Sequence, residues 1–89
     1  MAVVFTHAGK AIVTNRMIGS GTEPKYVAIG TGTNAAAAGD TALQTEVETR
    51  TSGTSSRVTT SQTNDTYQVV GTVTATGSRA VTEAGLLDA

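Results

Sequence analysis

The chain carries too few large apolar side chains to build a thick hydrophobic core, and this shortage limits its possible folds more than any other feature. Of its 89 residues, 21 are Val, Ile, Leu, Met, Phe or Tyr, whereas Thr alone supplies 18. No Cys is present, so no disulfide can reinforce a small core. The formal net charge is only −1, unlike the strong imbalance of disordered chains. We therefore expect one small folded domain, residues 1–89, that is most stable inside an assembly.

Local patterns predict the order of the structural elements. Residues 1–6 are expected to form an extended arm. Residues 7–18 have apolar positions near the helical spacing and follow Thr6, a residue type that caps helix N-termini, so they predict a helix. The glycines and proline of residues 19–24 then break the chain. Residues 25–87 are expected to form a β-rich body.

Alternation of apolar and polar residues is clearest in the last third of the chain. Residues 57–62, 67–75 and 80–87 predict three strands, separated by turn residues at Asn64–Asp65 and Gly77–Ser78. We predict that these strands pair in sequence order as an antiparallel meander. The fold class is then mainly β: a small antiparallel β-sheet or sandwich with a short N-terminal helix and an extended N-terminal arm.

One segment matches a dinucleotide-binding pattern. Residues 30–35, Gly-Thr-Gly-Thr-Asn-Ala, fit G-x-G-x-x-A, and Glu48 lies near the distance expected of a ribose contact. A dinucleotide site needs a parallel sheet and a helix N-terminus beneath the pyrophosphate, and 89 residues cannot hold that doubly wound sheet. We therefore interpret the segment as a glycine loop that lets the chain turn after Ile29.

The residue types required for metal binding or catalysis are scarce. His7 is the single histidine, and without Cys or a second His neither a zinc site nor a thiol–imidazole pair can form. A pairing of His7 with Asp40 or Asp65 stays open from sequence alone. Asp65, Glu83 and Asp88 lack the dense spacing of a calcium loop and are interpreted as solvated charges. We expect no enzyme activity, no metal and no cofactor.

Charge and hydropathy favour protein partners. The basic residues are spread along the chain and there are three aromatic residues, whereas nucleic-acid binding usually needs a dense basic patch with stacking rings. No apolar run is long enough to span a membrane. The apolar start, residues 1–5, lacks the basic region of a signal peptide. We expect no direct nucleic-acid or membrane contact, and synthesis in the cytoplasm.

A larger set of motifs appears in a fixed order along the chain. It consists of Lys25–Thr33, Ala35–Ala38 followed by Gly39–Leu43 and Glu46, then Asn64–Ala75, and finally Val81–Ala89 with its Thr-Glu-Ala-Gly-Leu core. This set resembles small virion proteins of tailed bacteriophages, and the match covers nearly the whole chain from Lys25 onward. One departure is Leu87, where such proteins often carry Phe. The change removes an aromatic anchor but keeps the position apolar.

The resemblance implies a structural role in a virion. Proteins with this set of motifs are described as capsid cement (decoration) proteins or as tail-fibre and tail-associated proteins. The first description implies a protein on the capsid surface that binds the major capsid protein and other copies of itself and bridges capsomers. The alternatives are a tail or fibre subunit and, from another class, a small ligand-binding module, which would usually expose Trp or Tyr in a pocket.

Candidate contact residues follow from expected exposure. The apolar arm and the apolar end of the chain are expected to be open to a partner, and arginine suits interface ion pairs because its planar guanidinium meets carboxylates in a bidentate way. The predicted partner-binding residues are Ala2, Val3, Val4, Phe5, Arg50, Arg57, Arg79, Leu86 and Leu87.

Overall fold

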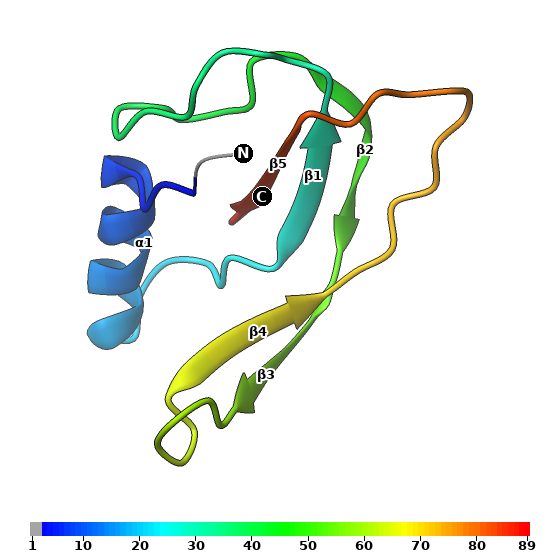
Figure 1. The fold of residues 1–89 in the computed structure, drawn as a ribbon. Helices are drawn as coiled ribbons and strands as arrows, with labels where there is room; N and C mark the ends of the chain where they lie inside the picture. Colours follow the sequence, from blue (N-terminus) through cyan, green and yellow to red (C-terminus); the bar gives the residue numbers. More distant parts are fainter. Residues whose placement is uncertain (1–2) are drawn as a thin grey trace.

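The computed structural model describes residues 3–89 as a mainly β protein with one short helix, as the sequence predicts. The elements are α1 (His7–Met17), β1 (Tyr26–Gly30), β2 (Glu46–Ser52), β3 (Thr54–Val58), β4 (Thr66–Val70) and β5 (Glu83–Leu87). They form an antiparallel three-stranded sheet in the order β2-β1-β5 and an antiparallel hairpin of β3 and β4. In Figure 1 the chain passes from β2 directly into β3, so the hairpin extends away from the sheet.

Local capping explains where α1 begins and ends. Thr6 is the N-cap, and its Oγ1 accepts a hydrogen bond of 3.0 Å from the Gly9 N–H. The helix ends at Met17, one residue before its predicted end, with Ile18 as the C-cap. Gly19 follows in the left-handed region, at φ 76°, and the next N–H groups bond back to carbonyls of the last turn in a Schellman motif.

The central strand β1 has a partner on each side. Gly30, its last residue, lies opposite Glu46 of β2 and Glu83 of β5. The pairing with β5 is regular, whereas the register with β2 shifts between Val27 and Ile29. β2 thus holds a bulge, and a bulge bends its strand and redirects the side chains beside it.

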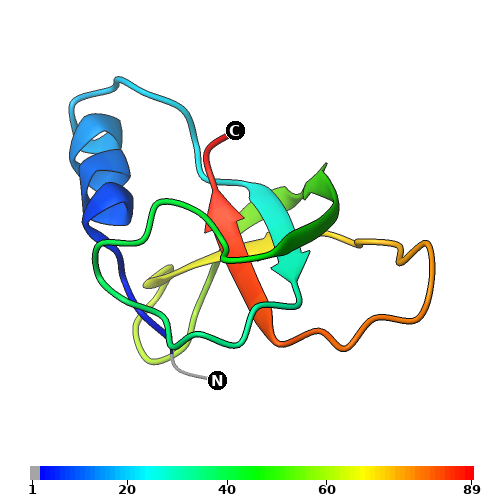
Figure 2. The ribbon, with the colours of Figure 1, turned by 90° about the horizontal axis from the view of Figure 1, so that it is seen from above.

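The predicted meander of the last three strands is wrong. β5 pairs with β1 rather than with the strand before it, and β4 pairs with β3. The strand predicted at residues 67–75 stops at Val70, and residues 71–82 form an irregular loop instead. β5 occupies the edge of β1 that β2 leaves open, and it therefore belongs to a different sheet from β4. The helix lies on one side of the sheet and this loop protrudes on the other (Figure 2).

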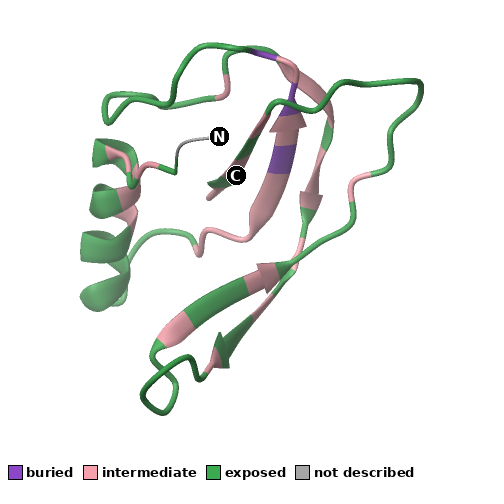
Figure 3. Ribbon diagram, in the orientation of Figure 1, coloured by how far each residue is buried: buried purple, intermediate pink, exposed green. Residues whose placement is uncertain are grey.

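The structure has almost no interior. Ala28, at 2% exposure in the middle of β1, is the only apolar side chain of residues 3–89 that is buried (Figure 3). The chain exposes 6104 Å². A compact monomer of 9.0 kDa would expose roughly 4,900 Å². The helix, the sheet and the hairpin therefore leave roughly 1,200 Å² more surface open than a closed domain of this mass.

Candidate interaction surfaces

Glu83 holds the longest loop of the first half against the sheet. Its Oε2 accepts from the N–H groups of Gly32 and Thr45, and its Oε1 from the Gln44 N–H, each at 2.8 Å. The Thr45 N–H, with those of Gln44 and Gly32, lowers the pKa of this carboxyl from its ordinary value, against an opposing effect of desolvation. One carboxylate at the start of β5 therefore fixes both ends of residues 31–45.

The glycines of the G-x-G segment make room for this carboxylate. A Cβ on Gly30 would lie 2.5 Å from the Thr45 carbonyl oxygen and from Glu83 Oε2, and a Cβ on Gly32 would lie 2.5 Å from the same Oε2. The strands around the segment are antiparallel, unlike the parallel sheet of a dinucleotide site. The segment is thus a glycine loop, as predicted, and Glu83 determines its shape. The interpretation of Glu83 as a solvated charge is wrong, because its carboxylate accepts three backbone hydrogen bonds.

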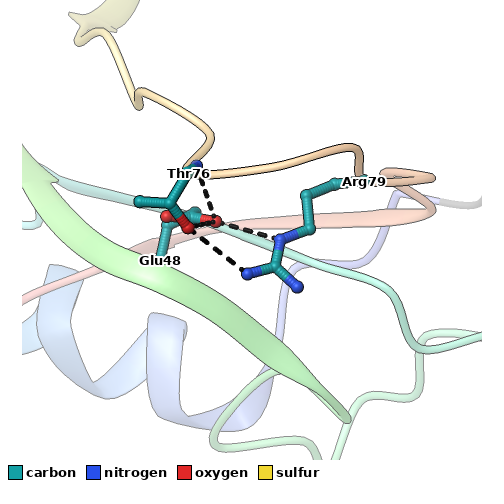
Figure 4. A network of polar contacts seen from close by, with 3 residues as sticks. All are labelled: Glu48, Thr76 and Arg79. Atoms are coloured by element: carbon teal, nitrogen blue, oxygen red, sulfur yellow. Dashed lines mark hydrogen bonds and ion pairs between the residues drawn. The ribbon is translucent and has the colours of Figure 1, made fainter.

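Glu48 plays a similar part for the loop of residues 71–82. It lies in the bulge of β2 with a left-handed φ of 64°, and its side chain is only 6% exposed. Its Oε1 accepts from the N–H and the hydroxyl of Thr76, both at 3.2 Å, and from Arg79 Nε at 3.0 Å (Figure 4). The Thr76 N–H and, more weakly, Arg79 lower the pKa of Glu48. The bulge thereby aims a carboxylate at the loop.

Two of the three predicted contact arginines are engaged within the chain. Arg50 is half-buried rather than exposed as predicted, because its Nε and NH2 bind Glu46 at 2.8 and 3.0 Å in a bidentate pair. Arg79 is exposed but pairs with Glu48. Arg57 is exposed on β3, beside a polar groove that Glu23 also lines. Arg50 and Arg79 are thus held by two carboxylates of β2, whereas Arg57 lies on the hairpin.

The predicted apolar contacts lie in two places. Ala2 is outside the described residues. In the arm, Val3 is 96% exposed and Phe5 is exposed, while Val4 is half-buried. Leu86 and Leu87 belong to β5 rather than to a free tail, and strand alternation leaves Leu86 exposed and Leu87 half-buried.

A further surface, which the sequence reasoning missed, lies between α1 and β4. It is a groove of about 490 Å³, lined by Ile12, Val13, Arg16, Met17, Glu23, Pro24 and Tyr67. The four helix residues have the spacing i, i+1, i+4 and i+5, which places them on one side of a helix. The spacing of these four residues could have indicated the helix wall of the groove. It could not indicate the opposite wall, because Tyr67 lies far away in the sequence.

Tyr67 ties the hairpin to the rest of the molecule. Its hydroxyl lies 3.1 Å from Glu23 Oε1 and 3.0 Å from the Pro24 carbonyl oxygen, both in the linker between α1 and β1. Burial, followed by the hydrogen bond to the Glu23 carboxylate, raises the pKa of this phenol. The groove wall on the hairpin side therefore depends on this one side chain.

We expect Tyr67→Phe to loosen this attachment. The variant keeps the ring but loses the hydroxyl, so Tm should fall by roughly 5 °C in a thermal melt. Tyr26→Phe is the matched control, because residues 3–89 provide no hydrogen-bond partner for the Tyr26 hydroxyl. If the two variants had the same Tm, the hydrogen bonds of the Tyr67 hydroxyl would make no measurable contribution to stability.

Two observations on residues 3–89 concern metal binding and membrane insertion. No group of three His, Cys, Asp or Glu side chains within residues 3–89 could hold a metal ion. The helix of the described chain is too short and too polar to cross a membrane. Comparison of the chain with protein-family models, curated proteins and solved structures found no match.

Proposed function

We propose that this chain is a structural subunit of a tailed-bacteriophage virion, a capsid cement protein that binds the major capsid protein on the capsid surface. It acts through interface area rather than through chemistry. The observation that carries the proposal is the surface of 6104 Å² with a single buried apolar side chain among residues 3–89. A chain with so little interior gains stability when neighbouring molecules cover its surface. The sequence resemblance supplies the kind of neighbour.

The arrangement of the chain fits bridging. The β3–β4 hairpin and the loop of residues 71–82 extend in different directions (Figure 1). No residue of α1, His7–Met17, is buried, so the helix offers a further open surface. Several separate surfaces can each take a weak contact with a different neighbour. On a lattice whose subunits are already close together, many weak contacts sum to strong retention.

The test is the copy number of this chain in purified particles whose heads and tails have been separated, measured by quantitative mass spectrometry. A number comparable to that of the major capsid protein, confined to heads, is the expected result. A much lower number that partitions with tails would instead identify a tail or fibre subunit. Absence from particles would contradict a virion role altogether.

A further inference from the structure

The groove between α1 and β4 lies directly beside protruding apolar side chains. Ile18, the C-cap of α1, is 78% exposed, and Met17, which lines the groove, is 81% exposed. A concave apolar site next to a convex one is complementary to a second copy of itself. A two-fold axis between two copies inserts the convex part of each into the concave part of the other.

The charges of the groove fit the same arrangement. Arg16 lines it from the helix and Glu23 from the linker, one charge of each sign. Two copies related by a two-fold axis can set each Arg16 against the Glu23 of the other copy. A partner of one predominant charge would meet one favourable and one unfavourable group. Charge complementarity therefore favours a second copy over a strongly acidic or basic partner.

Exposed apolar side chains are also concentrated here. Val13, Met17 and Ile18 lie within six residues of one another and are all exposed, and a two-fold contact would cover them in both copies. The helix itself needs a cover. Isolated helices below about 12–15 residues are marginal in water, and none of the residues of α1, His7–Met17, is buried.

We propose that the α1–β4 groove is a two-fold interface between two copies of this chain, with Ile18 of each copy seated in the groove of the other. This inference identifies the surface through which two copies of the proposed cement protein bind each other, and its relevance to a virion rests on the proposed function. Dimer formation itself can be tested with the purified chain, without any particle.

The first experiment is sedimentation velocity of the full chain across a concentration series. The chain should sediment as a dimer at tens of micromolar, and Ile18→Lys should raise the dimer dissociation constant at least about tenfold. Val81→Lys is the matched control. Val81 is also an exposed apolar residue, but it belongs to the loop of residues 71–82 and does not line the groove. This control should remain a dimer.

The second experiment reverses the charges of the interface. Arg16→Glu places two acidic groups in each groove, and Glu23→Arg places two basic groups there, so each variant alone should be monomeric. An equimolar mixture should form a heterodimer, because each groove then finds the opposite charge in its partner. Because Glu23 also accepts a hydrogen bond from the Tyr67 hydroxyl, circular dichroism of each variant alone serves as the control for its fold.

Three results would overturn the inference. They are a wild-type chain that stays monomeric at all concentrations, a dimer that Ile18→Lys leaves intact, and a trimer or larger ring. If the chain is monomeric but Ile18→Lys lowers its occupancy on particles, the groove binds the major capsid protein instead. A dimer that is absent from particles would uphold the interface and contradict the proposed function, so the two failures are distinguishable.

Discussion

Glu83→Ala is expected to release residues 31–45 from the sheet and to lower Tm by roughly 10 °C or more. The substitution leaves the N–H groups of Gly32, Gln44 and Thr45 without the acceptor that each now has at 2.8 Å. Hydrogen bonds to an ionised acceptor are about twice as strong as neutral ones. The loop then depends on single hydrogen bonds, such as that from the Thr82 hydroxyl to the Gly32 carbonyl at 2.6 Å.

Glu83→Gln separates the charge from the shape of the side chain. An amide has one acceptor oxygen, so the variant can serve the two donors at Oε2 but then turns an NH2 group toward the Gln44 N–H. We expect its Tm to lie between those of the wild type and Glu83→Ala. Glu46→Ala is the control, because the Glu46 carboxylate pairs with the Arg50 side chain rather than with backbone N–H groups. A half-buried pair at the surface, still in contact with water, contributes less than three hydrogen bonds to backbone N–H groups.

Hydrogen exchange gives the residue-specific measurement. The amide protons of Gly32, Gln44 and Thr45 should exchange much faster in Glu83→Ala, while the amides of the β3–β4 hairpin should keep their rates. A uniform increase across the chain would mean that Glu83 supports the whole fold rather than one loop. Unchanged rates at the three amides would contradict the role assigned to the carboxylate.

The elements that could be predicted from the sequence are those fixed by local chemistry. Thr6 and Gly19 each act through neighbours within a few residues, and the structure confirms the helix cap and the break after the helix. Asn64 likewise adopts the left-handed φ of 58° that suits its predicted turn. Local preference determines such positions because the competing conformations are unfavourable for those residues alone.

Strand pairing and the loop anchors could not be predicted in the same way. Nothing local to Glu83 indicates that its carboxylate meets Thr45, which is 38 residues away, and nothing local to β5 indicates that it pairs with β1. The bulge at Glu48 was missed for the same reason, since it is defined by a register between two strands. The G-x-G segment and the C-terminal Thr-Glu-Ala-Gly motif are both visible in the sequence. Their physical link, a glutamate that fills the space left by glycines, appears only in three dimensions.

The last prediction concerns acid, because carboxylates that accept backbone N–H groups anchor three loops. Glu83 and Glu48 hold the two long loops, and Asp65 accepts from the N–H groups of Gln62, Thr60 and Ser61 in the hairpin turn at 2.9 to 3.1 Å. These N–H groups, led by that of Gln62, hold the pKa of Asp65 far below its usual range. All three pKa values are lowered in the folded chain.

Lowered pKa values determine the sign of the pH dependence. In the unfolded chain each of these carboxyls takes up a proton near pH 4. In the folded chain the same carboxyls have lower pKa values and take up a proton only at lower pH. The stabilisation from these groups is therefore complete above about pH 5 and is lost as the pH falls through the folded values. Between about pH 4 and 2.5, these three groups together should contribute an uptake of between about one and three protons on unfolding.

Urea melts at pH 7, 5, 4, 3 and 2.5 measure this proton uptake from the change of the free energy of unfolding with pH. Asp65→Asn should reduce the uptake by about one proton. Added NaCl at about 0.5 M should leave the dependence largely in place, because hydrogen bonds to backbone N–H groups are screened less than exposed ion pairs. Stability that stays constant from pH 5 to 2.5, or a dependence abolished by salt, would show that surface ion pairs rather than the three loop anchors control the response to acid.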